Sequence, residues 1–102
     1  MEIVMSSFSL DLPGDFEDYA WEVEAKGWFS EARIIVAERL YRINFYDLPR
    51  LTQQVESEFE RGRIFFEPNL VIVQSITRVH MEQAVEALVQ SGQVFSLRAE
   101  QL

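Results

Sequence analysis

The spacing of the apolar residues changes repeatedly along this chain between two periods, and each change predicts a boundary between a strand and a helix. Residues 3–12 contain Phe8, Leu10 and Leu12 in alternation with Ser7, Ser9 and Asp11, which is the pattern of a half-buried strand. From residue 16 the apolar positions recur at i, i+3, i+4 and i+7, the spacing of one helix face. Similar changes continue to residue 98, so the sequence predicts strands and helices mixed along its whole length.

Turn and capping residues divide these segments. Asp15, Asp47 and Thr77 each precede a helical pattern, where a side-chain oxygen can accept from the free backbone N–H groups of the first turn. All four glycines fall between predicted elements: Gly14, Gly27, Gly62 and Gly92. Residues 29–36 and 40–46 are typical of a hairpin. The predicted order is therefore β-α-β-β-α-β-α-β, with a last strand over 93–98.

This order indicates an α+β fold with one mixed sheet of about five strands packed by three helices. The run Leu70–Val73 is apolar at every position, so we expect a central strand covered on both faces. A chain of 102 residues suits one domain, and we predict a single compact domain over 1–102.

The charge of the chain argues against several partners. Seventeen acidic residues face nine basic ones, which gives a net charge of −8, and the cations are scattered. Nucleic acids and anionic lipids bind to clustered Lys and Arg, so we expect neither as a partner. No apolar run reaches the roughly 20 residues of a membrane helix, and the start lacks a secretory signal pattern. We expect a soluble, cytoplasmic protein.

Residues for catalysis or metal binding are sparse. The chain has no cysteine and one histidine, His80, which lies in no nucleophile motif. The glycines form no phosphate-binding loop, and no calcium-loop pattern is present. We therefore predict no catalytic residue, no metal site and no cofactor, and the sequence leans away from an enzyme.

The remaining candidates are surface residues. The first predicted helix carries carboxylates at helical spacing, with Asp15, Asp18 and Glu22 on one face. Trp21 lies off the apolar stripe of this helix. Adjacent residues on a strand point to opposite faces, so one of Phe65 and Phe66 belongs to the core and the other is an interface candidate. The predicted protein-binding residues are Glu17, Asp18, Trp21, Glu22, Trp28, Phe65 and Phe66.

Three functions fit these observations. The first is a non-enzymatic protein–protein interaction module that forms a homodimer or serves as an accessory subunit. The second is a small acidic inhibitor or immunity-type protein that neutralises a basic partner. The third is a small-molecule-binding domain, with Ser75, Thr77 and His80 at the N-terminus of the third helix.

Overall fold

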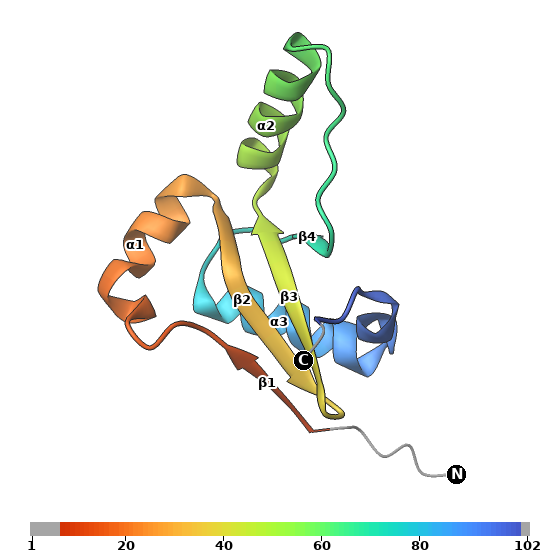
Figure 1. Ribbon diagram of the computed structural model, residues 1–102. Helices are drawn as coiled ribbons and strands as arrows, with labels where there is room; N and C mark the ends of the chain where they lie inside the picture. The colour runs from red at the N-terminus through yellow and green to blue at the C-terminus, as the bar shows by residue number, and fades with distance from the viewer. Residues whose placement is uncertain (1–6, 101–102) are drawn as a thin grey trace.

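Two long antiparallel strands, β2 (Trp28–Val36) and β3 (Arg39–Tyr46), form the middle of a computed structural model that describes residues 7–100 (Figure 1). β1 (Phe8–Asp11) pairs antiparallel with β2, and β4 (Leu70–Ile72) pairs parallel with β3. The strand order is β1-β2-β3-β4. The α+β class with one mixed sheet and three helices is therefore confirmed, and the sheet has four strands.

The hairpin between β2 and β3 turns on two residues, Ala37 and Glu38. Both have positive φ angles, of 49° and 64°. A two-residue loop with both residues in this region is a type I′ turn, whose twist matches that of the flanking strands. The predicted hairpin is thus present, although its turn uses residues other than the usual Asn and Gly.

One irregularity near the start of β2 determines which side chains enter the core. Phe29 pairs with Phe45 and Ala32 pairs with Ile43, so β2 has one more residue than β3 between these pairs. Such a bulge shifts the alternation of side chains by one position. Phe29 and Ala32 are therefore both buried, and burial then alternates regularly to Val36.

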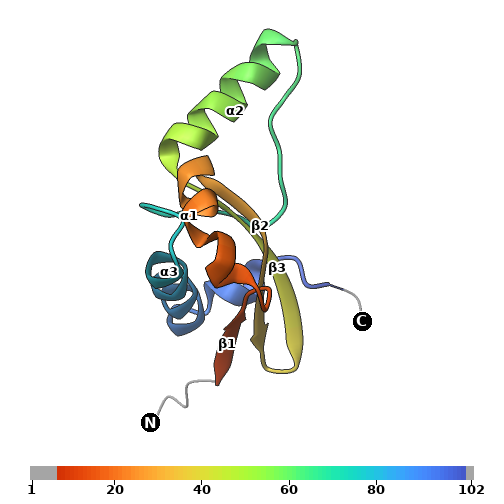
Figure 2. The same cartoon turned by 90° about the vertical axis from the view of Figure 1, so that its left-hand side faces the viewer.

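Two helices, α1 (Phe16–Lys26) and α3 (Arg78–Gln90), lie on the same side of the sheet (Figure 2). Their buried residues share one core with the inward positions of β2 and β3, which include Ile34, Tyr41 and Ile43. The other face of the hairpin carries exposed residues such as Ile35 and Arg42. Within residues 7–100, no helix combines the length and the apolar character that a membrane crossing requires.

The helix ends agree with the predicted caps at two of three positions. The Asp47 carboxylate accepts from the backbone N–H of Arg50 at 2.8 Å, and Thr77 accepts from that of His80 at 3.3 Å. The predicted cap at Asp15 is wrong, because its side chain accepts no capping hydrogen bond. α1 is also kinked at Tyr19, whose φ and ψ of −131° and 18° are not helical.

The third helix, α2 (Leu48–Glu60), does not pack on the sheet as predicted. It rises from the end of β3 and points away from the body of the molecule (Figure 1). None of its residues is buried. The molecule is consequently elongated, with extents of 51, 32 and 27 Å.

Two further predictions about strands are corrected. The run Leu70–Val73 was expected at the centre of the sheet, but β4 lies at its edge and Ile72 is exposed. The predicted strand over 93–98 is wrong, because Gln93–Ser96 form a 3-10 helix, η1, after Gly92. In the predicted strand over 3–12, β1 begins at Phe8, and residues 3–6 lie outside the described residues.

Candidate protein interface

The most unusual part of the molecule is a projection that we call the arm, which consists of α2 and the returning segment 61–69. α2 begins directly after β3, with Asp47 as its cap, and ends at Glu60. Gly62 follows with a φ of 71°, which reverses the chain. The segment then descends beside α2 to β4, as Figures 1 and 2 both show. The arm therefore connects β3 to its parallel neighbour.

An apolar stripe runs along α2 and is largely uncovered. It contains Leu48, Leu51, Val55 and Phe59, which follow one another at three or four residues. Leu48 is 62% exposed and Phe59 is 63% exposed, while Leu51 and Val55 are half-buried. In a water-soluble helix this stripe normally packs against a core. Here it has no core to pack against.

The returning segment exposes a second set of apolar side chains. Ile64 is 79% exposed and Phe66 is 77% exposed, whereas Phe65 and Glu67 are half-buried. This alternation is that of an extended backbone, on which successive side chains point to opposite sides. The two adjacent phenylalanines thus lie in different environments, and Phe66 is the exposed one.

Phe65 and Glu67 anchor the segment on Tyr46 at the base of the arm. The rings of Phe65 and Tyr46 meet edge to face, with their centroids 6.0 Å apart. The Tyr46 hydroxyl donates a hydrogen bond to a Glu67 carboxylate oxygen at 2.5 Å. Burial raises the pKa of Tyr46 well above its usual value, and the hydrogen bond to Glu67 raises this pKa further. Trp28 continues the cluster, with its ring 6.4 Å from that of Tyr46.

The acidic residues of α1 form a separate surface. Asp18 and Glu22 are exposed, and Trp21 between them is 69% exposed. Glu17 accepts a hydrogen bond at 2.7 Å from Arg78 of α3, so one of the predicted carboxylates is paired. The kink at Tyr19 interrupts the regular spacing that was expected to align Asp15 and Asp18 with the residues after it.

Ser75, Thr77 and His80 do come together at the start of α3. The Nδ1 atom of His80 lies 2.6 Å from Ser75 Oγ and 3.2 Å from Thr77 Oγ1. Among residues 7–100, no carboxylate hydrogen-bonds to the imidazole to orient it as a general base. These bonds form a local network at the cap of α3. The pockets found among residues 7–100 are lined by other residues.

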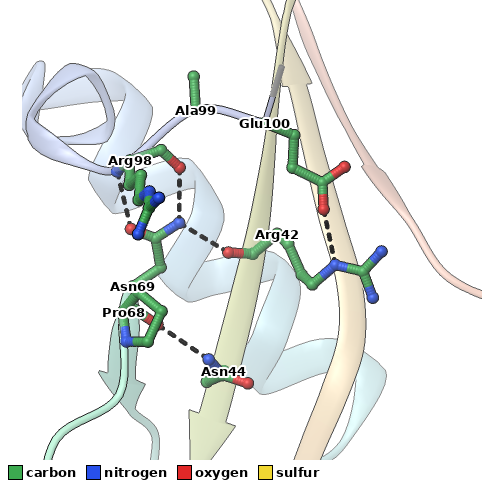
Figure 3. A pocket seen from close by; sticks show the side chains of 7 residues that line it. All are labelled: Arg42, Asn44, Pro68, Asn69, Arg98, Ala99 and Glu100. Carbon is green, nitrogen blue, oxygen red and sulfur yellow. Dashed lines mark hydrogen bonds and ion pairs between the residues drawn. The ribbon is translucent and has the colours of Figure 1, made fainter. Parts of the chain in front are cut away.

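A shallow pocket of about 480 Å³ lies where the C-terminal segment meets β3 (Figure 3). The side-chain amide of Asn69 donates to the backbone carbonyls of Arg42 and Arg98 and accepts from the Arg98 N–H, each at 2.8 Å. Glu100 accepts from the Arg42 guanidinium at 2.7 Å and donates its backbone N–H to Leu40 at 2.8 Å. These polar groups hold residues 98–100 beside the part of β3 that does not pair with β4. The pocket residues are Arg42, Asn44, Pro68, Asn69, Arg98, Ala99 and Glu100.

The structure therefore divides the predicted binding residues into two groups. Three of them lie on or at the base of the arm: Trp28 and Phe65 meet through Tyr46, and Phe66 is exposed beside them in the chain. The other four lie on α1: Glu17, Asp18, Trp21 and Glu22. Sequence reasoning missed the exposed positions Leu48 and Phe59, because a helical stripe gives the same signal whether or not the body covers it. It also missed Ile64, which lies on the returning segment. Within the described range, no group of three or more His, Cys, Asp or Glu residues is placed to hold a metal ion.

Comparisons of the chain with models of protein families, with curated proteins and with solved structures found no match in any of the three.

Proposed function

We propose that this chain is a non-enzymatic protein–protein interaction module whose contact surface is the arm. The observation that carries the proposal is the apolar stripe of α2, none of whose residues is buried and whose two end residues, Leu48 and Phe59, are mostly exposed. An isolated helix of 13 residues is marginal in water, and most helices are stabilised by packing of their apolar face. The arm thus presents a surface that a partner would complete.

The composition of this surface supports the same proposal. Interface cores are enriched in aromatic and aliphatic anchors and contain few charges. Phe59 and Phe66 each expose most of their side chain, and Leu48 and Ile64 add aliphatic area. Apolar residues exposed singly are common on soluble proteins, but several on one projecting element indicate a binding site.

Replacement of the two exposed phenylalanines of the arm tests the proposal. Sedimentation velocity of the purified chain reports self-association, and a tagged chain in native lysate reports other partners. We expect Phe59→Asp together with Phe66→Asp to abolish whichever complex the wild type forms. Val79→Asp is the matched control, because Val79 is also an exposed apolar residue but lies on α3, away from the arm. Complexes that survive the double change would contradict the proposal.

A second candidate is the inhibitor or immunity-type function, with α1 as the surface for a basic partner. The observation that favours it is Trp21, an exposed aromatic anchor between the exposed carboxylates of Asp18 and Glu22. Such a surface would speed association with a basic partner and make the association sensitive to salt.

Charge reversal separates the two candidates. If α1 is the contact surface, changing Glu17, Asp18 and Glu22 to lysine removes partner binding and its salt dependence, while the changes at Phe59 and Phe66 have no effect. Binding that is unaltered by the three lysines would exclude α1 as the contact surface.

A further inference from the structure

The segment 63–67, with the sequence Arg-Ile-Phe-Phe-Glu, is extended and pairs with none of the strands β1 to β4. α2 has 13 residues and is about 20 Å long at 1.5 Å per residue. Residues 62–69 return over this length at about 2.5–3 Å per residue, which exceeds the 1.5 Å rise of a helix and requires an extended backbone. Among residues 7–100, no hydrogen bond involves a backbone N–H or C=O of residues 64–67. Unpaired extended backbone of this kind is a template for strand addition.

We propose that the partner of this strand is the same strand of a second copy of the chain, paired antiparallel about Phe65. In this register Arg63 lies opposite the second copy's Glu67, and Ile64 lies opposite its Phe66. Each opposite pair then joins groups that attract, since cross-strand ion pairs and aromatic–aliphatic pairs both stabilise antiparallel strands. A parallel pairing in register would instead place each charge beside an identical one. The inference rests on the proposed function and specifies the partner.

The two charged residues retain the atoms that this pairing needs. Arg63 donates to Glu58 through Nε at 2.8 Å and through Nη2 at 3.0 Å, and these bonds do not use Nη1. Glu67 accepts from Tyr46 through Oε1, which leaves Oε2. One donor of Arg63 and one acceptor of Glu67 therefore remain for a second copy. The existing bonds also hold both side chains at the ends of the strand.

The distribution of charge permits self-association at the arm in spite of the acidity of the chain. Residues 48–69 contain three arginines and four glutamates, so their net charge is −1, against −8 for the whole chain. The arm projects from one end of a molecule 51 Å long (Figure 1). Because the arm is nearly neutral, repulsion between the arms of two copies is small compared with repulsion between their acidic bodies.

Charge exchange between Arg63 and Glu67 tests this register in the full-length chain by sedimentation equilibrium. Arg63→Glu alone and Glu67→Arg alone should each raise the homodimer Kd by about tenfold or more, because two cross-strand pairs become repulsive. An equimolar mixture of the two variants should form a heterodimer with wild-type affinity, since each variant then meets the opposite charge. Arg61→Glu is the control, because it makes the same change of charge on the arm outside the register.

Cysteine cross-linking gives a second readout that leaves both charges in place. The chain has no cysteine of its own, and positions 64 and 66 are exposed. Opposite residues of antiparallel strands have Cα atoms about 5 Å apart, within disulfide range. We expect Ile64→Cys mixed with Phe66→Cys to form a disulfide-linked heterodimer faster than either variant links to itself.

Three results overturn the inference. A wild type that is monomeric at every concentration removes the second copy as the partner, although loss of another partner on Phe59→Asp with Phe66→Asp would still support the proposed function. A dimer whose Kd is unchanged by both single charge reversals refutes the register. A dimer that also survives Phe59→Asp with Phe66→Asp refutes the register and the proposed function together.

Discussion

β3 and α2 follow one another in the chain and use their apolar residues in opposite ways. β3 buries Tyr41, Ile43 and Phe45 completely in the core that α1 and α3 cover. α2 carries a comparable number of apolar residues and buries none of them. The arm therefore contributes no buried residue to this core. We therefore expect substitutions in the body to lower mainly the free energy of unfolding. Substitutions in the arm, on the other side of this boundary, should weaken mainly the binding of a partner.

The largest expected effect is on the body side of the boundary. Ile43→Ala should lower the free energy of unfolding by roughly 2–5 kcal/mol, because it leaves a cavity in the centre of the core. Urea unfolding measures this loss through the midpoint and slope. The control is Ile35→Ala on the exposed face of β2, which should cost about 1 kcal/mol. Equal losses at both positions would contradict the one-sided core.

The junction between body and arm should be nearly as sensitive. Gly27 has a φ of 72°, and a Cβ placed there would lie 2.5 Å from the carboxylate oxygens of Asp47, the cap of α2. We expect Gly27→Ala to cost about 2 kcal/mol or more, from backbone strain together with the disturbed cap.

Gly62 offers a matched comparison at the tip of the arm. Its φ is 71°, but a Cβ there would have no atom within 4 Å. Gly62→Ala should therefore cost about 1 kcal/mol, from backbone strain alone. The difference between the two midpoints of unfolding measures the tight approach of Gly27 to Asp47, and the absence of a difference would contradict it.

Tyr46 links the body to the arm, and its contribution should depend on pH. Its pKa is raised in the folded chain, so folding favours the protonated hydroxyl. The resulting stability is present below the ordinary tyrosine pKa of about 10 and is lost as the pH rises above it. The loss should approach about 1.4 kcal/mol per pH unit. Tyr46→Phe should remove this part of the alkaline slope and cost about 1 kcal/mol at neutral pH.

Chemical unfolding from pH 7 to pH 11 measures both quantities for Tyr46. The pKa of Tyr19 is also raised, mainly by burial, so some alkaline slope should remain in the variant. An alkaline slope that is identical in the wild type and in Tyr46→Phe would show that the Tyr46–Glu67 contact does not hold the arm.

The smallest expected effect is on the arm itself. Phe59→Ser should change the free energy of unfolding by less than about 0.5 kcal/mol, because the side chain is mostly exposed. The measurement should be made at a concentration where the chain is monomeric, since association adds stability by mass action. A loss comparable to that of Ile43→Ala would mean that the body covers this residue.

Local patterns predicted the elements where the local signal and the packing agree. The hairpin follows from alternation, and the caps at Asp47 and Thr77 follow from side chains that reach their own helix. Asp15 failed as a cap because the start of α1 is held differently: the backbone N–H of Phe16 donates to Pro13 and that of Asp18 to Asp15, in turns closed by the main chain. Composition alone does not distinguish these two ways of beginning a helix.

The errors arise where packing between distant segments decides. Leu70–Val73 has the composition of a central strand. Asn69 and Glu100 hydrogen-bond to the rest of the free edge of β3, so β4 pairs with only its last residues and stays short. Val94 enters the core from a 3-10 turn instead of a strand. The exposure of α2 was not predictable, because the spacing of Leu48 and Phe59 does not state what lies opposite them.

The position of β4 also determines the order in which the molecule should fold. β2 and β3 are neighbours in the chain and can pair early. Leu70 and Asn44 are separated in sequence by the whole arm, so they can pair only after the arm has folded back to the sheet. Closing this long loop costs conformational entropy before any hydrogen bond between β3 and β4 can form. We therefore expect β4 to be the last strand to join and the first to open, so that its amides exchange hydrogen well before those of the hairpin.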